Sequence, residues 1–311
     1  MPNTTEPSRT VYIIAGPTAV GKSTIAYFLA KRINGEIINC DSVQLYKYMD
    51  IGSAKPERAQ MDEIPHHLYG ILDPTNKITV AKYQQLALTV IDNVLSRGKT
   101  PIVVGGTGLY LNSILYDMSF AAKPDNNGQR RKELEDMAEK NGNEYMFEYL
   151  SAVDPEAAAR IHPNNIKKII RAIEAWELGD KVKDLNNCRP NTKYDFKFFG
   201  LTMDREWLYE RINKRVLKLV KTGLVDEVKN LMAMGLTADS PSMQGIGYKE
   251  TIDFLEGKKE LKETIYDIMK NTRHYAKRQL TWLKRYGDDI TWIEIRKGET
   301  AGAIIDEMLS R

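Results

Sequence analysis

The sequence GPTAVGKS, from Gly16 to Ser23, has the spacing G-x-x-x-x-G-K-S/T. Glycines in such a turn let backbone N–H groups point at an anion, and the N-terminus of a following helix adds partial positive charge. Lys22 can then reach terminal phosphates, and the Ser23 hydroxyl suits Mg²⁺. We predict that this segment binds a phosphate chain. The pattern does not say whose phosphate it is, or whether a phosphate is transferred.

An aspartate follows the next apolar run along the chain. Asp41 comes directly after EIINC, which reads as a buried strand. Its carboxylate is therefore expected at the carboxyl edge of a sheet, where open α/β sheets bind ligands. It could ligate a metal, act as a base, or cap the following turn, which is the usual role of an Asp-Ser pair. The residue pattern leaves these three roles open.

A second glycine turn, GGTGLY, runs from Gly105 to Tyr110 between an apolar run and a helical pattern. It offers another set of inward N–H groups together with the Thr107 hydroxyl. Alone, this string is weak evidence for anion binding. Beside a phosphate loop in a parallel sheet, it becomes a plausible partner in anion binding.

Few other residues in the sequence suggest a metal site, a disulfide or another chemical function. The pair His66-His67 has no third ligand at a metal-binding spacing, so we interpret it as structural or as pocket lining. Cys40 and Cys188 are far apart and form no C-x-x-C pair, so neither a zinc ribbon nor a disulfide framework is indicated. The start of the chain is polar without an apolar core, and no apolar run approaches about 18 residues. We expect a cytoplasmic protein that does not cross a membrane.

These candidate residues need a scaffold, and the hydrophobic pattern predicts one. Strands are expected at residues 11–15, 36–40 and 101–104, alternating with helices at 22–33 and 79–95. The stripe of the first helix is predicted from Ile25, Phe28, Leu29 and Ile33. Strands alternating with helices imply parallel pairing in a doubly wound sheet.

The alternation of expected strands and helices stops in the middle of the chain. From about residue 118 to 194 the pattern is helical, with a stripe of Ile166, Ile169, Ile170, Ile173 and Trp176. A strand is then expected at 195–202, and the length of 311 residues exceeds one usual compact core. We predict an α/β fold: a P-loop NTPase-like parallel-sheet core from residues 1–117 and 196–311, with an all-helical insertion domain at 118–195. Further helices are expected at 206–221, 225–234, 248–255, 261–286 and 301–309, and a last strand at 290–295.

Net charge is only +3, so any nucleic-acid contact must come from a local patch. Residues 269–286 hold six Lys or Arg and no Asp or Glu. Lys270, Arg273, Lys277 and Lys284 fall on one helical face, which could follow phosphates while the opposite face packs. An ordinary solvated basic face has the same pattern.

Several long strings occur here in the order found in tRNA dimethylallyltransferases, and the chain resembles that family from Val11 to about Trp292. They are GPTAVGKS, CDSVQLYKYMDIGSAKP, PHHLYGILDP, GGTGLYLNSIL, the HPNN-to-RAIEAWE stretch, MQGIGYKE and KRQLTWLKR. The resemblance implies transfer of a dimethylallyl group from dimethylallyl diphosphate to the exocyclic N6 of the adenine immediately 3′ of the tRNA anticodon, with Mg²⁺ as cofactor. It implies that the phosphate loop holds the diphosphate leaving group.

The resemblance also implies roles for particular residues. Asp41 would be the general base, with Lys22 and Thr107 acting at the diphosphate and Ser23 at the metal. The diphosphate would be bound by Gly16, Pro17, Thr18, Ala19, Val20, Gly21, Lys22, Ser23 and either Arg211 or Arg215. The implied tRNA contacts are Asp41, Ser42, Val43, Gln44, Arg130, Lys167, Lys168, Ile169, Ile170, Arg171, Gln244, Gly245, Lys277, Arg278, Gln279, Trp282 and Arg285.

Three other functions share parts of this pattern. A P-loop nucleotide kinase has the same loop, but it does not explain GGTGLY or the basic helix. An adenylate isopentenyltransferase would use the same donor with a free nucleotide, and the helical insertion favours tRNA instead. An RNA-binding NTPase-like module would have no transferase activity. Our expected partners are tRNA and dimethylallyl diphosphate, and we expect a monomer.

Overall fold

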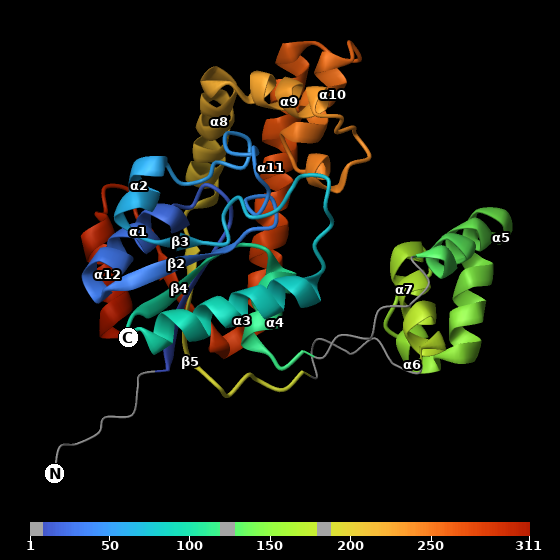
Figure 1. Cartoon of the computed structure of the whole chain (residues 1–311), viewed down its shortest axis with the longest axis horizontal. Coiled ribbons are helices and arrows are strands. Elements are labelled where there is room, and N and C mark those ends of the chain that lie inside the picture. Colours follow the sequence, from blue (N-terminus) through green and yellow to red (C-terminus); the bar gives the residue numbers. More distant parts are fainter. Residues whose placement is uncertain (1–8, 119–127, 179–187) are drawn as a thin grey trace. The chain divides into compact units, whose positions relative to one another are not determined.

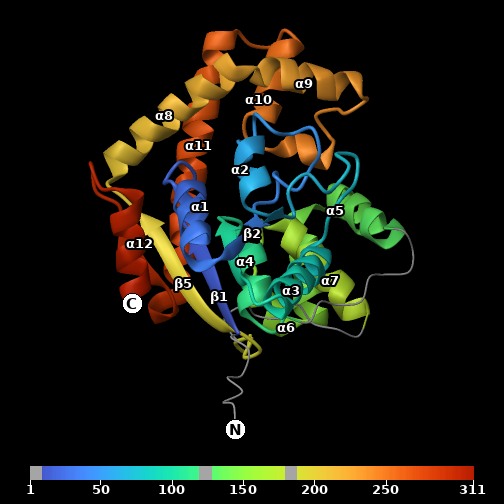
Figure 2. The same ribbon diagram turned by 60° about the vertical axis from the view of Figure 1, so that its left-hand side comes forward.

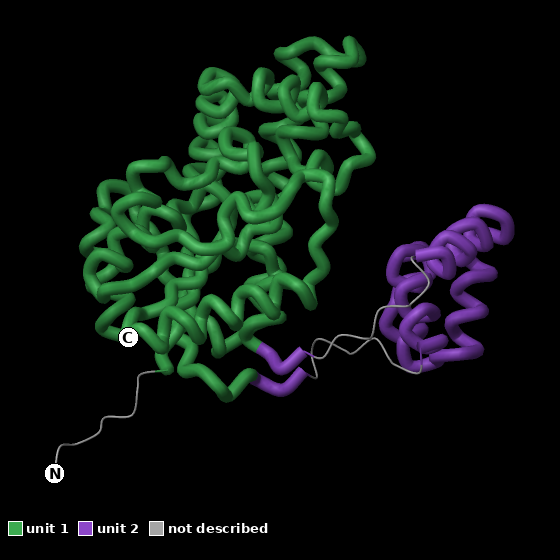
Figure 3. Tube along the Cα trace, in the orientation of Figure 1, with its two compact units in different colours: residues 1–115, 191–311 green, residues 116–190 purple. Residues whose placement is uncertain are grey.

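The computed structural model describes residues 9–118, 128–178 and 188–311. The chain divides into two compact units, one made of residues 1–115 and 191–311 and the other of residues 116–190 (Figure 3). The sequence placed these divisions at 118 and 195. We describe each unit by itself.

Unit 1 is built on a six-stranded sheet with the strand order β3-β2-β4-β1-β5-β6, and every neighbouring pair is parallel. Five of these strands are predicted by apolar runs in the sequence. The sixth, β3, is missed because two residues are too few to show a pattern. The strands are β1 (Thr10–Ala15), β2 (Gly35–Cys40), β3 (His66–His67), β4 (Thr100–Gly105), β5 (Asp195–Thr202) and β6 (Thr291–Glu294).

Helices cover both faces of this sheet. The crossover from β1 to β2 and the crossover from β3 to β4 run in opposite directions along the sheet, so right-handed connections place their helices on opposite faces. One face carries α1 (Lys22–Ile33) and α12 (Ala301–Ser310), which lie side by side (Figures 1 and 2). The other carries α3 (Val80–Ser96) and α4 (Gly108–Leu115).

One predicted core residue of α1 is wrong. Ile25 and Leu29 are buried against the sheet, but Phe28 is 46% exposed. Its ring packs edge-on against Tyr27 instead. At 3.6 residues per turn, Phe28 lies at the border of the apolar stripe, where the sequence pattern does not decide between core and solvent.

A helical layer connects β5 to β6 and forms the upper part of unit 1 in Figure 1. In it, α11 packs against α8 and α4, and α10 packs against α9. Tyr248, Ile252, Leu231 and Val228 share one buried cluster there. The helices are α8 (Arg205–Thr222), α9 (Leu224–Ala233), α10 (Tyr248–Leu255) and α11 (Leu261–Leu283), and the short elements of unit 1 are α2 (Arg58–Glu63), η2 (Pro241–Gln244) and η3 (Lys284–Asp289).

Unit 2 holds α5 (Gln129–Val153), α6 (Pro155–Ala158) and α7 (Ile166–Glu177), and no strand lies within its residues 128–178. α5 is broken at Gly142, where φ is 84°. In the predicted stripe of α7, Ile169, Ile170 and Ile173 are buried and Ile166 is partly buried, whereas Trp176 is 42% exposed. Residues 119–127 and 179–187 of the predicted helical stretch, and residues 1–8 of the polar start, lie outside the described residues.

In the part of the chain that the structure describes, no helix is both long and apolar enough to cross a membrane.

Candidate active site

The phosphate loop has the strand-turn-helix context that its pattern requires. Gly16 follows β1, and a Cβ there would lie 2.7 Å from the Leu201 carbonyl oxygen, which only a glycine avoids. Gly21 caps α1 with φ 112°, a left-handed conformation that favours glycine. Val20 packs into the core beneath. The loop is therefore fixed on one side by the sheet and opens on the other.

Lys22 is the first residue of α1, and its side chain turns back over the loop. Its Nζ donates hydrogen bonds to the carbonyl oxygens of Gly16 (2.9 Å) and Pro17 (2.8 Å). Burial lowers the pKa of Lys22 to about 8, although nearby Asp41 favours the charged form. An anion in the loop would add a strong partner for this poorly solvated ammonium group.

This lowered pKa predicts how donor binding depends on pH. A bound diphosphate favours the protonated form of Lys22, so the pKa of Lys22 is higher in the complex than in the free protein. Above pH 8 binding must take up a proton, and the Kd for dimethylallyl diphosphate should rise about tenfold for each pH unit. We would measure this without Mg²⁺ by calorimetry from pH 7 to 9.5. In the Lys22→Met control the dependence should vanish, and a flat wild-type profile would contradict the assignment.

Asp41 lies at the carboxyl end of β2 and uses only one carboxylate oxygen for local structure. Its Oδ1 accepts from the backbone N–H groups of Val43 (2.9 Å) and Gln44 (3.4 Å). The turn-capping role is therefore present. Its Oδ2 accepts no hydrogen bond from the described residues, so the same side chain keeps an oxygen available for a ligand.

The second glycine turn meets this segment directly. Gly105 ends β4, and a Cβ there would lie 2.1 Å from the Cys40 carbonyl oxygen, so no larger residue fits. Thr107 follows, and its Oγ1 accepts from the Ser42 backbone N–H at 3.2 Å. The two segments that carry Asp41 and Thr107 are thereby joined.

A cavity of about 560 Å³ in unit 1 brings these parts together. Arg211 and Arg215, the two arginines that the sequence leaves as alternatives, both line it. Arg211 is exposed, and its Nε donates to the Ala19 carbonyl oxygen at 2.9 Å. Burial lowers the pKa of Arg215, which lies beside Asp41. The cavity is lined by Thr18, Ala19, Gly21, Lys22, Ser23, Thr24, Asp41, Gln44, Ala54, Lys55, Pro56, Glu57, Gln60, Tyr69, Val104, Gly105, Arg211, Lys214, Arg215, Lys218 and Gln279.

Three of these cations are absent from the prediction. Lys214 and Lys218 extend the arginines into an i, i+3, i+4, i+7 stripe along α8, and that spacing could have revealed them. Lys55 has no such signal, because only the fold brings it to the cavity. In total six cationic and two acidic side chains line the cavity. The site is therefore built for an anion.

Gln279 has a role that the sequence does not suggest. Its buried Oε1 accepts from the Thr18 backbone N–H at 2.8 Å, and its Nε2 donates to the Gly106 carbonyl oxygen at 3.2 Å. The side chain therefore bridges the phosphate loop and the second glycine turn. The Trp282 ring lies so close to Gly108 that a Cβ there would be 2.3 Å from it. The tRNA contacts of Gln279 and Trp282 stay predictions.

The remaining predicted tRNA contacts of unit 1 lie in the segment after β2 and in or near η2, α11 and η3. Gln44 is tied down by its Nε2, which donates to the carbonyl oxygens of Ser53 (3.0 Å) and Ala54 (3.1 Å). Gly245 lies against Val43, which is two residues after Asp41 in the chain. Exposed side chains in this predicted set are Gln244 at the end of η2, Lys277 and Arg278 on α11, and Arg285 in η3.

In unit 2, the predicted tRNA contacts have mixed positions. Lys167 and Lys168 are exposed at the start of α7. The side chains of Ile169 and Ile170 are buried in the core of this unit, so they hold the helix in place and offer no side-chain surface. Arg171 lies 3.8 Å from Glu174, and Arg130 pairs with Glu133 and Glu177. The tRNA contacts of Lys167, Lys168, Arg171 and Arg130 stay predictions.

The histidine pair is engaged in structural contacts. His67 Nε2 lies 2.7 Å from Glu36 Oε2, and His66 Nδ1 lies 2.7 Å from the Ile64 carbonyl oxygen. Among the described residues no group of three or more His, Cys, Asp or Glu side chains could hold a metal. Mg²⁺ needs no such group, since it commonly uses one or two protein ligands with phosphate oxygens and water. Ser23 lines the cavity beside Lys22, and its hydroxyl suits the role of one such protein ligand.

Comparisons with known proteins agree on one family. A model of the IPP transferase family matches residues 44–286. The chain is 49% identical over 285 residues to a tRNA dimethylallyltransferase of Alkaliphilus oremlandii strain OhILAs (91% of this chain, 90% of that protein). It is 46% identical over 301 residues to one of Alkaliphilus metalliredigens strain QYMF (96% of each).

Two solved structures are also similar. One is the full-length tRNA isopentenylpyrophosphate transferase from Bacillus halodurans, with a TM-score of 0.73 and 40% identity over 97% of this chain and 95% of that one. The other is a eukaryotic dimethylallyltransferase acting on tRNA, with a TM-score of 0.80 and 30% identity over 92% of this chain and 74% of that one.

Proposed function

The chain belongs to the IPP transferase family, and on that premise we propose that it transfers a dimethylallyl group from dimethylallyl diphosphate to tRNA. The observation that carries this proposal is the single cavity shared by the phosphate loop, the cationic stripe of α8 and Asp41. An anion-binding loop and a carboxylate with an available oxygen are the two groups that alkylation of an amine by an allylic diphosphate requires. The acceptor is the exocyclic N6 of the adenine immediately 3′ of the anticodon.

The leaving group determines what most of the cavity does. As the allylic C–O bond breaks, negative charge grows on the departing diphosphate. Fixed cations and backbone N–H groups that already face this position stabilise the transition state without reorganisation. Lys22, Arg211 and Arg215 line the cavity and would take this role, with Thr107 at the neighbouring turn. Mg²⁺ held through Ser23 would neutralise further charge on the diphosphate.

The acceptor amine needs a base only late in the reaction. The lone pair of adenine N6 is delocalised into the ring, so the N–H proton becomes acidic only as the new N–C bond forms. Asp41 Oδ2 can accept a hydrogen bond from N6–H, orient the amine and then take the proton. The bond to diphosphate breaks, the N–C bond forms, and the proton moves to Asp41.

The target base must leave its stack to reach this cavity, as for other enzymes that act on a base. Contacts to the tRNA backbone would offset that cost. Lys270 and Lys277 are exposed on α11 and would make such contacts. Arg273, predicted on the same face, instead donates to Asn213 Oδ1 at 2.7 Å and lies over the Tyr209 ring, so it is committed to α8.

This placement predicts the salt dependence of tRNA binding. Replacing Lys270, Lys277 and Lys284 together with Gln should reduce the slope of log K against log[salt] by about two to three, because each phosphate contact releases counterions. The measurement is a tRNA-binding titration at several salt concentrations. A matched control replaces three exposed lysines outside both α11 and η3, namely Lys82, Lys197 and Lys297, and should leave the slope unchanged. Equal slopes for all three proteins would remove α11 from the RNA interface.

The donor and the acceptor that the protein uses distinguish the proposed function from its rivals. We would incubate the protein and Mg²⁺ with labelled dimethylallyl diphosphate and either unmodified tRNA or AMP, and in parallel with ATP and tRNA. The proposal predicts labelled tRNA, little labelled AMP and no ADP. Labelled AMP alone would favour an adenylate isopentenyltransferase, and ADP from clean protein would favour a kinase or NTPase.

We further propose a cytoplasmic monomer. The phosphate loop, Asp41 and the cationic stripe of α8 lie in one chain, so a monomer would hold the groups that this reaction uses. The substrate class, tRNA, is found in the cytoplasm.

A further inference from the structure

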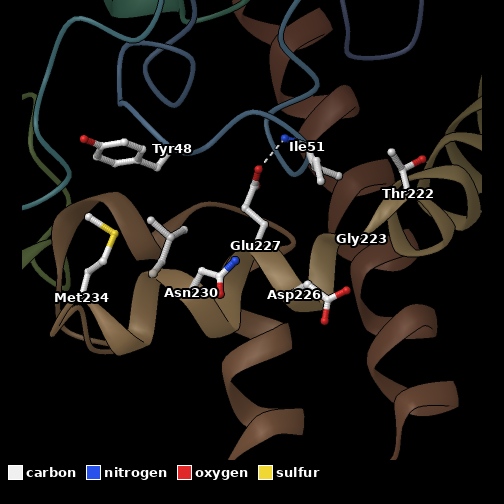
Figure 4. A pocket seen from close by; sticks show the side chains of 9 residues that line it. Tyr48, Ile51, Thr222, Gly223, Asp226, Glu227, Asn230 and Met234 are labelled. Carbon is white, nitrogen blue, oxygen red and sulfur yellow. Dashed lines mark hydrogen bonds between the residues drawn. The ribbon is translucent and has the colours of Figure 1, made fainter.

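A buried carboxylate outside the reaction cavity holds a loop that forms one wall of it. Glu227 lies in the first turn of α9 and is only 9% exposed. Its Oε2 accepts from the backbone N–H groups of Asp50 (2.8 Å) and Ile51 (2.6 Å), and its Oε1 accepts from that of Gly52 (2.9 Å). Figure 4 shows this side chain aimed at the Ile51 backbone. Three consecutive N–H groups thus converge on one carboxylate.

Tyr248 of α10 completes the arrangement. Its hydroxyl donates to Glu227 Oε1 at 2.8 Å and accepts from the Ser53 backbone N–H at 3.0 Å. A Cβ on Gly52 would lie 2.5 Å from the Tyr248 ring, so the loop touches the ring directly. Four successive backbone N–H groups, from residues 50 to 53, are therefore fixed by two side chains from the helical layer.

The same loop separates two cavities. Tyr48 and Ile51 line an outer cavity of about 400 Å³ beside Glu227 (Figure 4). Residues 54–57 line the reaction cavity. Glu227 holds the loop from the outer side, while the chemistry takes place on the inner side.

On the inner side the loop positions groups that the reaction uses. The Ser53 carbonyl oxygen accepts from Gln44 and, at 3.5 Å, from Arg215. The side chain of Lys55 is 7% exposed, and its Nζ pairs with Asp50 Oδ1 at 2.6 Å and donates to the Tyr46 carbonyl oxygen. Asp50 is one of the residues whose N–H group Glu227 holds. A continuous set of contacts therefore runs from Glu227 through Asp50 to the ammonium group of Lys55.

We propose that Glu227, assisted by Tyr248, is a positioning residue that holds the loop of residues 50–55 so that Lys55 binds the diphosphate of the donor. This inference rests on the proposed function. Neither Glu227 nor Tyr248 touches substrate. Their effect is on donor affinity, and the acceptor side of the cavity is left unchanged.

Glu227→Gln tests the positioning role of Glu227 most directly. Both carboxylate oxygens accept from N–H or O–H donors, so the amide NH₂ must face at least one donor whichever way the side chain is turned. We expect the KM for dimethylallyl diphosphate and the Kd for inorganic diphosphate to rise about tenfold, with tRNA affinity within twofold of wild type. Asp226→Asn is the matched control, because it neutralises the carboxylate of the preceding residue of α9, whereas the hydrogen bonds to residues 50–52 are made by Glu227.

Lys55→Met supplies a readout that a purely structural role would not move. Lys55→Met should raise the KM for the donor to a similar degree, and Glu227→Gln should add less than twofold in that background, because the two residues act through one contact. Tyr248→Phe keeps the ring and should raise the KM about threefold, so it tests the inference even if Glu227→Gln fails to fold.

The outcomes separate this inference from the proposed function. Wild-type protein that does not alkylate tRNA with dimethylallyl diphosphate would overturn the function itself. Active wild type, with Glu227→Gln and Tyr248→Phe both at wild-type donor KM and diphosphate Kd, would overturn only the positioning role. Effects of Glu227→Gln and Lys55→Met that multiply in the double variant would also overturn it.

Discussion

Replacing Asp41 with asparagine should lower the single-turnover rate of tRNA alkylation by about 10²–10⁴ while both substrates still bind within a few-fold of wild type. Asparagine keeps the size of the side chain and can still accept from the Val43 and Gln44 N–H groups, so the turn is preserved. It cannot take a proton at neutral pH. The lost function is therefore proton transfer at Oδ2, the oxygen with no partner among the described residues.

The same variant separates the three roles that the sequence leaves open for Asp41. A near-wild-type rate would mean that the residue only caps the turn. A rate restored by raising the Mg²⁺ concentration would mean that it acts chiefly through the metal. The measurement is single-turnover alkylation of tRNA across a Mg²⁺ series. Either of the first two results would remove Asp41 as the general base.

Replacing Lys22 with methionine should reduce kcat by about 10²–10³ at saturating substrates. The ammonium group lies over the phosphate loop in a poorly solvated position, where its charge acts on the leaving group with little screening. Methionine keeps the length and apolar body of the side chain but removes the charge. Loss should therefore fall mainly on the chemical step and also, more weakly, on donor binding.

The control for this variant is Lys214→Met. Lys214 lines the same cavity from α8 but is exposed, so solvent screens its charge and the change should cost no more than about tenfold. The comparison uses single-turnover rates at saturating donor and tRNA. Equal losses in the two variants would show that the cavity acts through its total charge, and would contradict a specific role for Lys22.

The sequence is informative wherever a function depends on neighbours in the chain. The loop at residues 16–23, the strand that ends at Cys40 and the turn at Gly105 are each local patterns, and parallel pairing brings their ends to one edge. The sequence also predicts Arg211 and Arg215, and helical spacing alone would have added Lys214 and Lys218.

Contacts between distant segments are what sequence reasoning misses. The resemblance implies a tRNA contact for Gln279, but nothing in the sequence indicates that this side chain joins two glycine turns more than 170 residues away. Glu227 reads as a solvated first-turn acid of α9, yet it holds the backbone of residues 50–52, which lie 175 to 177 positions earlier. Hydrophobic periodicity carries no information on such pairings, because they depend on how α9 and α11 pack in the fold.

The proposed reaction joins the dimethylallyl group of an allylic diphosphate to an adenine of tRNA. Its most direct test is mass spectrometry of nucleosides from unmodified tRNA incubated with the protein, Mg²⁺ and dimethylallyl diphosphate, with nuclease mapping of the modified position. The account predicts an adenosine heavier by one dimethylallyl group, located immediately 3′ of the anticodon and absent when Asp41→Asn replaces wild type on the same time scale. Unchanged nucleosides with wild-type protein, or a dimethylallyl group at another base, would contradict it.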